Sequence, residues 1–407
     1  MSRQGVPTER VDELLATPGD VAVTPLLPAM AANAEHADRT RTIADEVIGP
    51  LKASPVVRMA ASPSLGGEGA TVTQIGRELE AVAAACTSTA WVLWNHLSVF
   101  HLFVGCLGPG HADWLRSQVE AGETVCFPAG AGSGVQGVVA DGVARLNGKG
   151  SFGTGGRYAD WAGVAFVVVD ADGRRAEPLD IRFTVVDLRG PGVKIDPNWD
   201  GSGVRASATD DIHYTDVVVD LDRCVEWYGA NRAESLRHVP VVDHRYREDW
   251  VGLSDLWLAW MGVGLVRTAL GEVVDEFVDR KSILGRKMVT HPTVQLNLGA
   301  AASLVSAAAA TAGAACREVD ERIAAEQAPT EADYLRQMAQ SSGALRQLEE
   351  AMDLLRRSQG GNGLRESKTF ERRWRDFQAM PLHINAHQDR VDLRLGRHLL
   401  GEDQDPF

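Results

Sequence analysis

The sequence is poor in cysteine and has no cysteine pair of the kind that binds zinc. Its 407 residues contain five cysteines, all far apart in the chain: Cys86, Cys106, Cys126, Cys224 and Cys316. Thiols scattered in this way predict neither a zinc site nor a disulfide framework, so no metal site is expected. They fit a reducing compartment.

An excess of positive charge is also lacking. Lys and Arg number 41 against 55 Asp and Glu, which gives a net charge of -14 at pH 7. A chain this acidic repels nucleic-acid phosphates and anionic membrane surfaces. We therefore expect no nucleic-acid and no membrane partner, and chemistry on a small molecule is favoured.

Targeting and membrane signals are missing as well. The chain begins MSRQGVPTERVDELL, with charges where a signal peptide needs an apolar core. No stretch approaches the roughly 18 uninterrupted apolar residues of a membrane span. The sequence predicts a cytoplasmic protein.

What the sequence does contain is a change of hydrophobic period along the chain. Apolar residues recur at spacings of three and four from about residue 8 to 118, which predicts an all-helical first domain over residues 1–120. Short β-branched runs bounded by Gly and Asp then follow about ten residues apart, without helices between them. They predict a central antiparallel β-barrel or sandwich over residues 121–235, and they disfavour a Rossmann domain.

Helical periodicity returns in the last part of the chain. The long segments are separated by breaks rich in Pro and Gly, and their bounds are about 247–289, 292–325, 331–358 and 369–401. A four-helix bundle over residues 236–407 is the economical interpretation, so the fold class is α+β. Residues 300–316, AAASLVSAAAATAGAAC, are Ala-rich on nearly every face, which suits helix contacts inside an oligomer.

Three local motifs resemble one known family. They are SFGTGGRYADW at 151–161, NWDGSGVRASATDDIHYTDVVV at 198–219 and SQGGNGLRESKTFERRWRDFQA at 358–379. Together with the order helices, β domain, bundle, they resemble the acyl-CoA dehydrogenases. The resemblance implies that the first motif lies beside a flavin ring and that the third forms a GlyGly-x-Gly loop followed by an Arg-Asp helix.

One position distinguishes the branches of that family. Its dehydrogenases carry a catalytic glutamate eight or nine residues beyond the Arg of the Arg-Asp pair, and here His383 and Ile384 stand at those distances from Arg375. The alternative glutamate position falls near residues 251–261, VGLSDLWLAWM, which contain no glutamate. The histidine is similar to that of two-component flavin monooxygenases, which hydroxylate phenols or oxidise dibenzothiophene.

The resemblance implies an oxygen-transfer role for His383. In such enzymes reduced flavin and O2 form a C4a-hydroperoxide, which needs exclusion of water and hydrogen bonds to its distal oxygen. His383 would supply that bond or act as a base, with the ordinary histidine pKa of about 6.5. A polar helix residue paired with solvent or a carboxylate is the alternative. His387, four residues on, would share its helical face, in the same pocket or in a structural role.

Other site residues follow from the same resemblance. Thr154 stands where relatives often carry Ser, so its hydroxyl and the adjacent amides, including that of Gly155, are candidates to contact the flavin or the oxygen species; a plain glycine turn is the alternative. Trp161 resembles the aromatic residue beside the isoalloxazine, or it packs in the core. Of two histidines on an apolar helix, His101 is preferred to His96 as a pocket residue, and both are alternatively core histidines.

The flavin phosphates require donors, which this family takes partly from a neighbouring subunit. The candidates are Phe127 to Ser133 (FPAGAGS), Arg280, Gln295, and the loop glycines Gly360, Gly361 and Gly363. Arg280 could form charge-assisted bonds to phosphate, or it is a solvated helix-end charge, and a GlyGly loop also terminates helices. Shared donors imply an obligate oligomer, in this fold usually a homotetramer.

The favoured function is that of a reduced-flavin-dependent monooxygenase acting on an aromatic or polycyclic small molecule. Its cofactor would be reduced FMN or FAD from a separate NAD(P)H-dependent flavin reductase, with O2 as co-substrate, since the chain lacks a nicotinamide-binding fingerprint. Ten tryptophans suit an aromatic pocket. Two alternatives remain: an oxidase, dehydrogenase or N-oxygenase with tightly bound FAD, and a non-catalytic binding protein.

Overall fold

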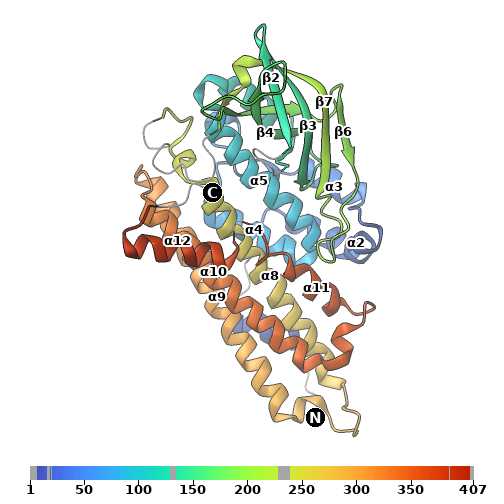
Figure 1. Cartoon of the computed structure of the whole chain (residues 1–407). Helices are drawn as coiled ribbons and strands as arrows, with labels where there is room; N and C mark the ends of the chain where they lie inside the picture. The colour runs from blue at the N-terminus through green and yellow to red at the C-terminus, as the bar shows by residue number, and fades with distance from the viewer. Residues whose placement is uncertain are drawn as a thin grey trace.

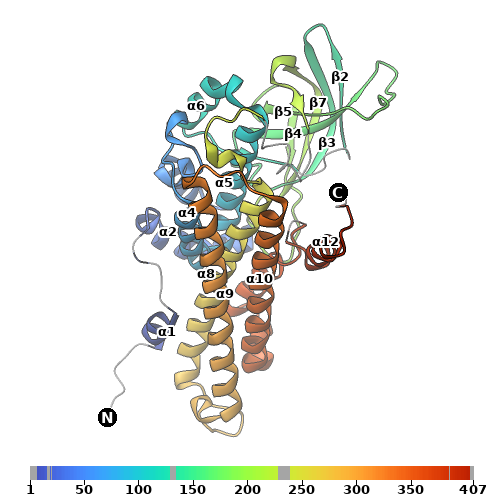
Figure 2. The ribbon, with the colours of Figure 1, turned by 90° about the vertical axis from the view of Figure 1, so that its left-hand side faces the viewer.

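The computed structural model describes residues 7–15, 19, 21–128, 134–227, 239–384 and 386–403. The chain has a helical N-terminal part, a β-sheet that caps one end, and long helices that extend away from the sheet (Figures 1 and 2). Ser133 lies outside the described residues. The order helix, sheet, helix agrees with the predicted order.

The N-terminal part contains six α-helices. Their bounds are α1 Pro7–Leu15, α2 Leu27–Thr40, α3 Asp45–Ala53, α4 Val72–Ala85, α5 Thr87–Leu107 and α6 Ala112–Glu120. A capping box formed by Thr71 and Gln74 begins α4, because it satisfies free backbone amides of the first turn. Helix α5 is buried on nearly all sides, and Val92 and Asn95 are its half-exposed residues on the site-facing half.

The sheet has eight strands. They are β1 Val125–Cys126, β2 Val135–Ala140, β3 Val143–Gly153, β4 Trp161–Val169, β5 Ile181–Asp187, β6 Val193–Asp196, β7 Asp210–Asp220 and β8 Val225–Glu226. Their order is β6-β7-β3-β2-β4-β5-β8, with β1 also paired to β4. A two-residue hairpin turn joins β2 and β3, and Asp141 and Gly142 both have positive φ, as such a turn requires.

The prediction of a purely antiparallel sheet was wrong. The pairs β1 with β4 and β2 with β4 are parallel. After the β2–β3 hairpin, the segment 154–160 carries the chain across the end of β2, so that β4 pairs with the other edge of β2 in the same direction. A sequence period of two is the same in parallel and antiparallel strands, so it does not reveal this direction.

The C-terminal part begins with three long helices. They are α8 Trp250–Asp279, α9 Pro292–Ala324 and α10 Glu331–Gln359, followed by the shorter α11 Thr369–Gln378 and α12 Gln388–Leu400. The prediction of one helix over 369–401 was wrong, because α11 ends at Gln378 and residues 379–384 form turns. Pro381 lies three residues beyond the end of α11, where its missing amide cannot continue a helix.

Three helices are long and apolar enough to cross a membrane by length and composition: α5, α8 and α9. The expectation that no such stretch exists was therefore wrong. The apolar windows of α5 and α8 are 78% and 83% buried inside the protein, whereas that of α9 is 33% buried. The apolar character of α5 and α8 is accounted for by packing within this fold.

The Arg375–Asp376 pair joins the three parts of the molecule. The Arg375 guanidinium donates to Asp38 of α2 at 3.1 and 2.9 Å and to the Ser202 carbonyl at 2.6 Å. The Asp376 carboxylate accepts from the Val204 amide at 2.7 Å. Burial raises the pKa of Asp376 to about 6, and that amide bond opposes the rise. Helix α11 thus ties the N-terminal helices and the strand-connecting segment 199–208 to the long helices.

Replacement of Asp38 tests this joint. In Asp38→Ala the nearly buried Arg375 loses one of its two carboxylate partners and keeps Glu371. We expect the free energy of unfolding to fall by about 2 kcal/mol, the value of hydrogen bonds to a charged group. Glu35→Ala on the same helix removes an exposed pair with Arg39 and should cost at most about 0.5 kcal/mol. Urea unfolding of both variants measures the difference, and equal losses would contradict the assignment.

Candidate active site

His383 lies in the turn between α11 and α12. Its ring packs edge-on against two tryptophans of α5, at centroid distances of 5.9 Å from Trp91 and 4.9 Å from Trp94. It is therefore not a helix residue, and His387, at the N-cap of α12, does not share a helical face with it. The packing against α5 places the imidazole in the interior, next to an aromatic wall.

The surroundings change the charge of His383. Burial lowers its pKa to about 4, and the positive charge of Arg390 contributes in the same direction. The expected ordinary histidine pKa does not hold here, because desolvation disfavours the imidazolium. At neutral pH the ring is neutral, so it can donate one hydrogen bond and accept another, and it is a weaker base than a solvated histidine.

Thr154 is in the turn between β3 and β4 and is 6% exposed. Its hydroxyl lies 3.0 Å from that of Thr209, which lies 2.7 Å from the Ser207 hydroxyl. The amides of Thr154, Gly155 and Gly156 already donate to carbonyl groups of the protein. The Thr154 hydroxyl can thus form a further hydrogen bond, whereas the adjacent amides are already paired.

Phe152, beside this turn, is not among the site residues predicted from the sequence. It combines a left-handed backbone, at φ 58°, with a side chain that is 62% exposed. Its ring lies 6.5 Å from that of Trp199, edge-on. A bulky residue held in this backbone region is uncommon and is typical of functional turns. The exposed position of an aromatic residue is a tertiary property that the motif itself does not reveal.

Helix α5 brings the Thr154 turn and His383 to one place. An added Cβ at Gly155 would stand 3.2 Å from Val92, and Trp91, the preceding residue, contacts the His383 ring. One turn further, the buried Asn95 side-chain oxygen has no hydrogen-bond partner among the described residues. A polar atom without a partner at such a position indicates a site for a bound molecule.

His96 and His101 make structural bonds. The Nε2 atom of His96 lies 2.8 Å from the Val57 carbonyl, and its Nδ1 accepts the Val125 amide at 3.1 Å. Both ring nitrogens of His96 are thereby used. The His101 Nε2 lies 2.9 Å from the Glu248 carbonyl, and its ring packs on Tyr246. These contacts are those of histidines in the protein core, which is the alternative interpretation given for both residues.

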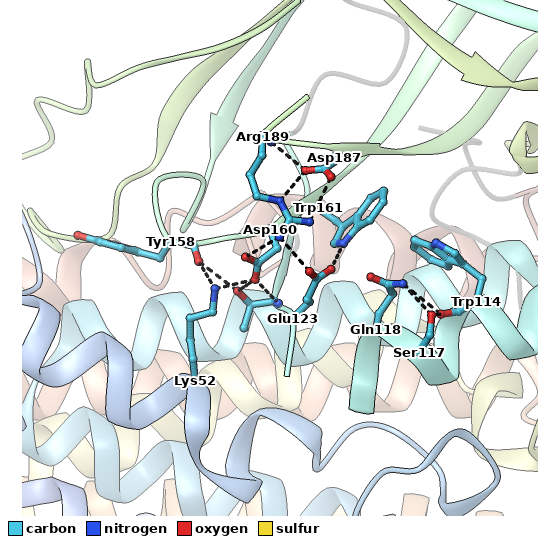
Figure 3. Close-up of polar contacts among 11 residues, drawn as sticks. Lys52, Trp114, Ser117, Gln118, Glu123, Tyr158, Asp160, Trp161, Asp187 and Arg189 are labelled. Carbon is cyan, nitrogen blue, oxygen red and sulfur yellow. Dashed lines mark hydrogen bonds and ion pairs between the residues drawn. The ribbon is translucent and has the colours of Figure 1, made fainter. Parts of the chain in front are cut away.

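Trp161 and Phe127 lie in two different aromatic groups. Figure 3 shows Trp161 beside Trp114 and Glu123, at the junction of α6 with the sheet. These contacts point away from Thr154 and His383. Phe127 packs with Trp227 and Trp250 at 5.7 and 6.0 Å, at the start of α8. Phe127 therefore belongs to an aromatic cluster near the inner end of α8, whereas Trp161 supports the sheet.

The polar network in Figure 3 also supports the sheet. The Asp160 carboxylate accepts from Lys52 at 2.6 Å and from the Thr124 amide at 2.8 Å. Arg189 bridges Glu123 and Asp187 at 2.9 and 2.8 Å. These bonds hold the start of β4 against α3 and α6, and thus the end of the Thr154 turn.

The remaining predicted residues gather at the opposite end of the long helices. Arg280 ends α8 and donates to the side-chain and main-chain oxygens of Gln359 at 2.7 and 3.0 Å, directly before Gly360. Gly360 and Gly361 are exposed, and Gly363 is buried. Exposed Gln295 lies in the first turn of α9 and donates to the Val289 carbonyl. This end lies away from the sheet (Figure 1).

The residues at the Thr154 turn fit a flavin ring. Exposed Phe152 and half-buried Trp199 offer flat apolar surface, Thr154 offers a hydroxyl, and Asn95 offers an amide oxygen without a partner. Planar heteroaromatic rings with polar edges are bound by such combinations. The cationic Arg280, by contrast, lies at the far end of the helices, so that one subunit does not place it beside this turn.

Comparison with known proteins agrees with the fold and the motifs. Residues 256–388 match the family described as acyl-CoA dehydrogenase, C-terminal domain. The structure of XiaF from Streptomyces sp., in complex with FADH2 and glycerol, superimposes with a TM-score of 0.84 at 21% identity and covers 98% of both chains. The chain thus has an acyl-CoA dehydrogenase-like fold.

Two relatives named for their activity indicate which class of enzymes this chain resembles. The chain is 26% identical to the oxygenase component of an FADH2-dependent resorcinol hydroxylase from Rhizobium sp. (strain MTP-10005), over 91% of each chain. It is 22% identical to the oxygenase component of p-hydroxyphenylacetate 3-hydroxylase from Acinetobacter baumannii, over 94% of this chain and 88% of that one. The predicted resemblance is confirmed, because both of these relatives are oxygenase components of two-component flavin-dependent hydroxylases.

The neutral, buried state of His96 predicts a pH dependence. Burial lowers its pKa to about 4 from 6.5, so below pH 6.5 the unfolded chain binds a proton that the folded chain does not. The free energy of unfolding should therefore fall, through this group, by about 1.4 kcal/mol per pH unit between pH 6.5 and 4. His96→Gln lacks this loss, so its deficit relative to the wild type should shrink in urea unfolding from pH 7 to pH 5. A deficit independent of pH would contradict the assignment.

Proposed function

We propose that the protein is the oxygenase component of a two-component flavin-dependent monooxygenase that hydroxylates an aromatic or polycyclic small molecule. The observation that carries the proposal is the neutral His383, packed on Trp91 and Trp94 where a dehydrogenase of this fold has its catalytic glutamate. Relatives named as hydroxylase oxygenase components support it.

The cofactor of the proposed reaction is reduced FMN or FAD from a separate NAD(P)H-dependent reductase. When bound, the reduced flavin supplies two electrons and activates O2, so that one oxygen atom enters the substrate and the other leaves as water. Solved structures of the same fold are described with FADH2 and with FMN. The Thr154 hydroxyl and the Asn95 amide oxygen are the proposed polar contacts of the ring, with Phe152 and Trp199 beside it.

His383 would hold a proton at the reacting oxygen. A neutral imidazole donates one hydrogen bond without a net charge that attracts water, and the two tryptophans limit solvent access. Its depressed pKa makes general-base catalysis a lesser role at neutral pH, since the imidazolium is disfavoured. Exclusion of water and orientation of one proton are thus the contributions of this chain at the reacting atoms.

A homotetramer in the cytoplasm is the assembly that we propose. Arg280, Gln295 and the exposed Gly360–Gly361 loop follow the end of α8, begin α9 and follow the end of α10, respectively. Figure 1 shows that the long helices extend away from the sheet at this end. Helix α9, with its apolar window 33% buried, offers a surface rich in alanine for subunit contacts. A neighbouring subunit could then supply the cationic and loop donors to the flavin phosphates.

The function is tested with purified protein, photoreduced FAD or FMN, O2 and a panel of phenols. We expect a hydroxylated product and little hydrogen peroxide from the wild type. In His383→Ala the ratio of product to oxidised flavin should fall by about 100-fold, as expected for loss of a positioned proton donor, and peroxide should rise correspondingly. His398→Ala, on the exposed side of α12, serves as the control. A wild type that yields only peroxide with every phenol and both flavins would overturn the proposal.

The shared flavin site predicts a concentration dependence. Arg280→Ala should weaken the binding of reduced FAD by about tenfold, which is the value of one charge-assisted bond. Replacement of the exposed Arg39 of α2 by Ala is the control and should leave the binding unchanged. Light scattering should give a tetramer for the wild type, and dilution below the tetramer dissociation constant should weaken flavin binding. A monomer with full flavin affinity would contradict the shared site.

A further inference from the structure

Asp255 on α8 is a buried carboxyl group that the sequence analysis passed over. Its side chain is 1% exposed, and neither carboxyl oxygen has a hydrogen-bond partner among the described residues. It stands within residues 251–261, the segment in which no glutamate was found. The same segment therefore does carry an acid, although a shorter one.

A buried carboxyl group without partners is costly. Leaving a polar group unsatisfied in the interior costs about 1–3 kcal/mol, and more if it is charged. Burial also raises the pKa of Asp255 well above its ordinary value, with Arg390 opposing and Asp249 reinforcing the rise. A residue that weakens the fold in this way needs a functional explanation, because most apolar residues of similar size would pack there at lower cost.

Trp94 connects His383 with the turn of α8 that carries Asp255. The Trp94 ring packs on the His383 ring at 4.9 Å, and its indole nitrogen donates to the Ser254 carbonyl at 2.8 Å. Ser254 directly precedes Asp255 on α8. One tryptophan thus connects the candidate catalytic histidine with the turn of α8 that carries the unpaired acid.

Arg390 supplies the complementary group. Its guanidinium donates to the Ile384 carbonyl at 3.3 Å, in the turn that carries His383, and its buried Nε has no partner among the described residues. Arg390 acts electrostatically on both Asp255 and His383. An acceptor on Asp255 and a donor on Arg390 therefore remain unpaired, and Arg390 is the charged group that Asp255 and His383 share.

The other titratable groups around Asp255 have partners of their own. Asp249 caps the start of α8 by accepting from the Val251 amide at 2.8 Å. Tyr334 of α10 and Arg394 of α12 lie within hydrogen-bond distance of each other, at 3.4 Å, and Tyr334 feels the charges of Asp249, Asp255 and Arg390. The carboxyl of Asp255, by contrast, has no hydrogen-bond partner among the described residues, and neither has the Nε of Arg390.

We propose that Asp255 and Arg390 bind a hydroxyl group of the aromatic substrate and hold its ring beside His383. A hydroxyl group suits this site because it donates to the Asp255 oxygen and accepts from the Arg390 Nε at the same time. An ether or a bare arene leaves both groups unpaired, and sites built to bond a hydroxyl discriminate strongly against such analogues. Asp255 is thus a specificity-determining residue, and the inference rests on the proposed function.

The test measures binding without turnover. Wild-type tetramer with reduced FAD, kept anaerobic, is titrated with resorcinol and with 1,3-dimethoxybenzene, whose hydroxyl groups are methylated, and heat is recorded by calorimetry. In Asp255→Leu we expect resorcinol to bind 10- to 100-fold more weakly, the loss of about 1–3 kcal/mol that an unmade buried bond represents. The affinity for 1,3-dimethoxybenzene should stay equal or rise. Asp255→Asn, which retains an acceptor, should recover part of the resorcinol affinity.

Urea stability distinguishes a binding role of Asp255 from a structural role. If Asp255 were structural, its replacement would lower the stability, whereas a binding role predicts that stability stays equal or rises. The raised pKa means that the folded state keeps a proton that the unfolded chain releases, so wild-type stability falls as pH rises above the ordinary aspartate pKa. Both Asp255 variants should therefore match or exceed the wild type in urea midpoint at pH 8. Asp320→Asn is the matched control, because its carboxylate accepts from the Val72 and Thr73 amides at the start of α4. It should lose stability and keep its resorcinol affinity.

The outcomes separate this inference from the proposed function. If the wild type binds resorcinol and both Asp255 variants bind it equally well, the hydroxyl site is wrong and a bound water satisfies Asp255, while the monooxygenase proposal stands. If both variants lose urea stability like the Asp320 control, Asp255 is structural. If no phenol binds the wild type in the presence of reduced flavin, both proposals fall.

Discussion

The arrangement of the three parts depends on the polar contacts that Arg375 and Asp376 make with two other segments of the chain. These two residues of α11 reach a helix of the N-terminal part and the segment that leads into β7. That segment contains Val204 and Ala208, both with positive φ, a backbone state that persists only where surrounding contacts impose it. The Thr209 hydroxyl, directly after this segment, lies 3.0 Å from that of Thr154. The Arg-Asp motif therefore acts by holding the Thr154 turn in place relative to the long helices.

Helix α5 is the second constraint, because both halves of the site are built on it. Its Trp91 and Trp94 pack on His383, and its Val92 meets the Thr154 turn. A helix buried on nearly every side has few places to keep an unsatisfied polar group, so the free Asn95 oxygen and the nearby Asp255 carboxyl stand out. Unpaired buried polar atoms cost stability, and under the proposals above both would gain a partner when flavin and substrate bind.

The charge of the site follows from its burial. His383 is kept neutral by desolvation and by Arg390, and Asp255 is pushed toward its protonated form by the same cause. A neutral imidazole beside two tryptophans can direct a proton without drawing in water. This suits oxygen transfer to an apolar ring better than proton abstraction by a charged base.

The sequence by itself determined the order of helices and strands and the helices and strands of most segments, and it singled out residue 383 as a candidate, because hydrophobic period and local motifs are properties of neighbouring residues. Tertiary structure alone decided the parallel pairing of β4, the end of α11 at Gln378, and the core bonds of His96 and His101. It also decided that the buried carboxyl of Asp255 has no hydrogen-bond partner among the described residues. Pairing direction, burial and the loss of hydrogen-bond partners arise from contacts between residues far apart in the chain, and no local pattern records them.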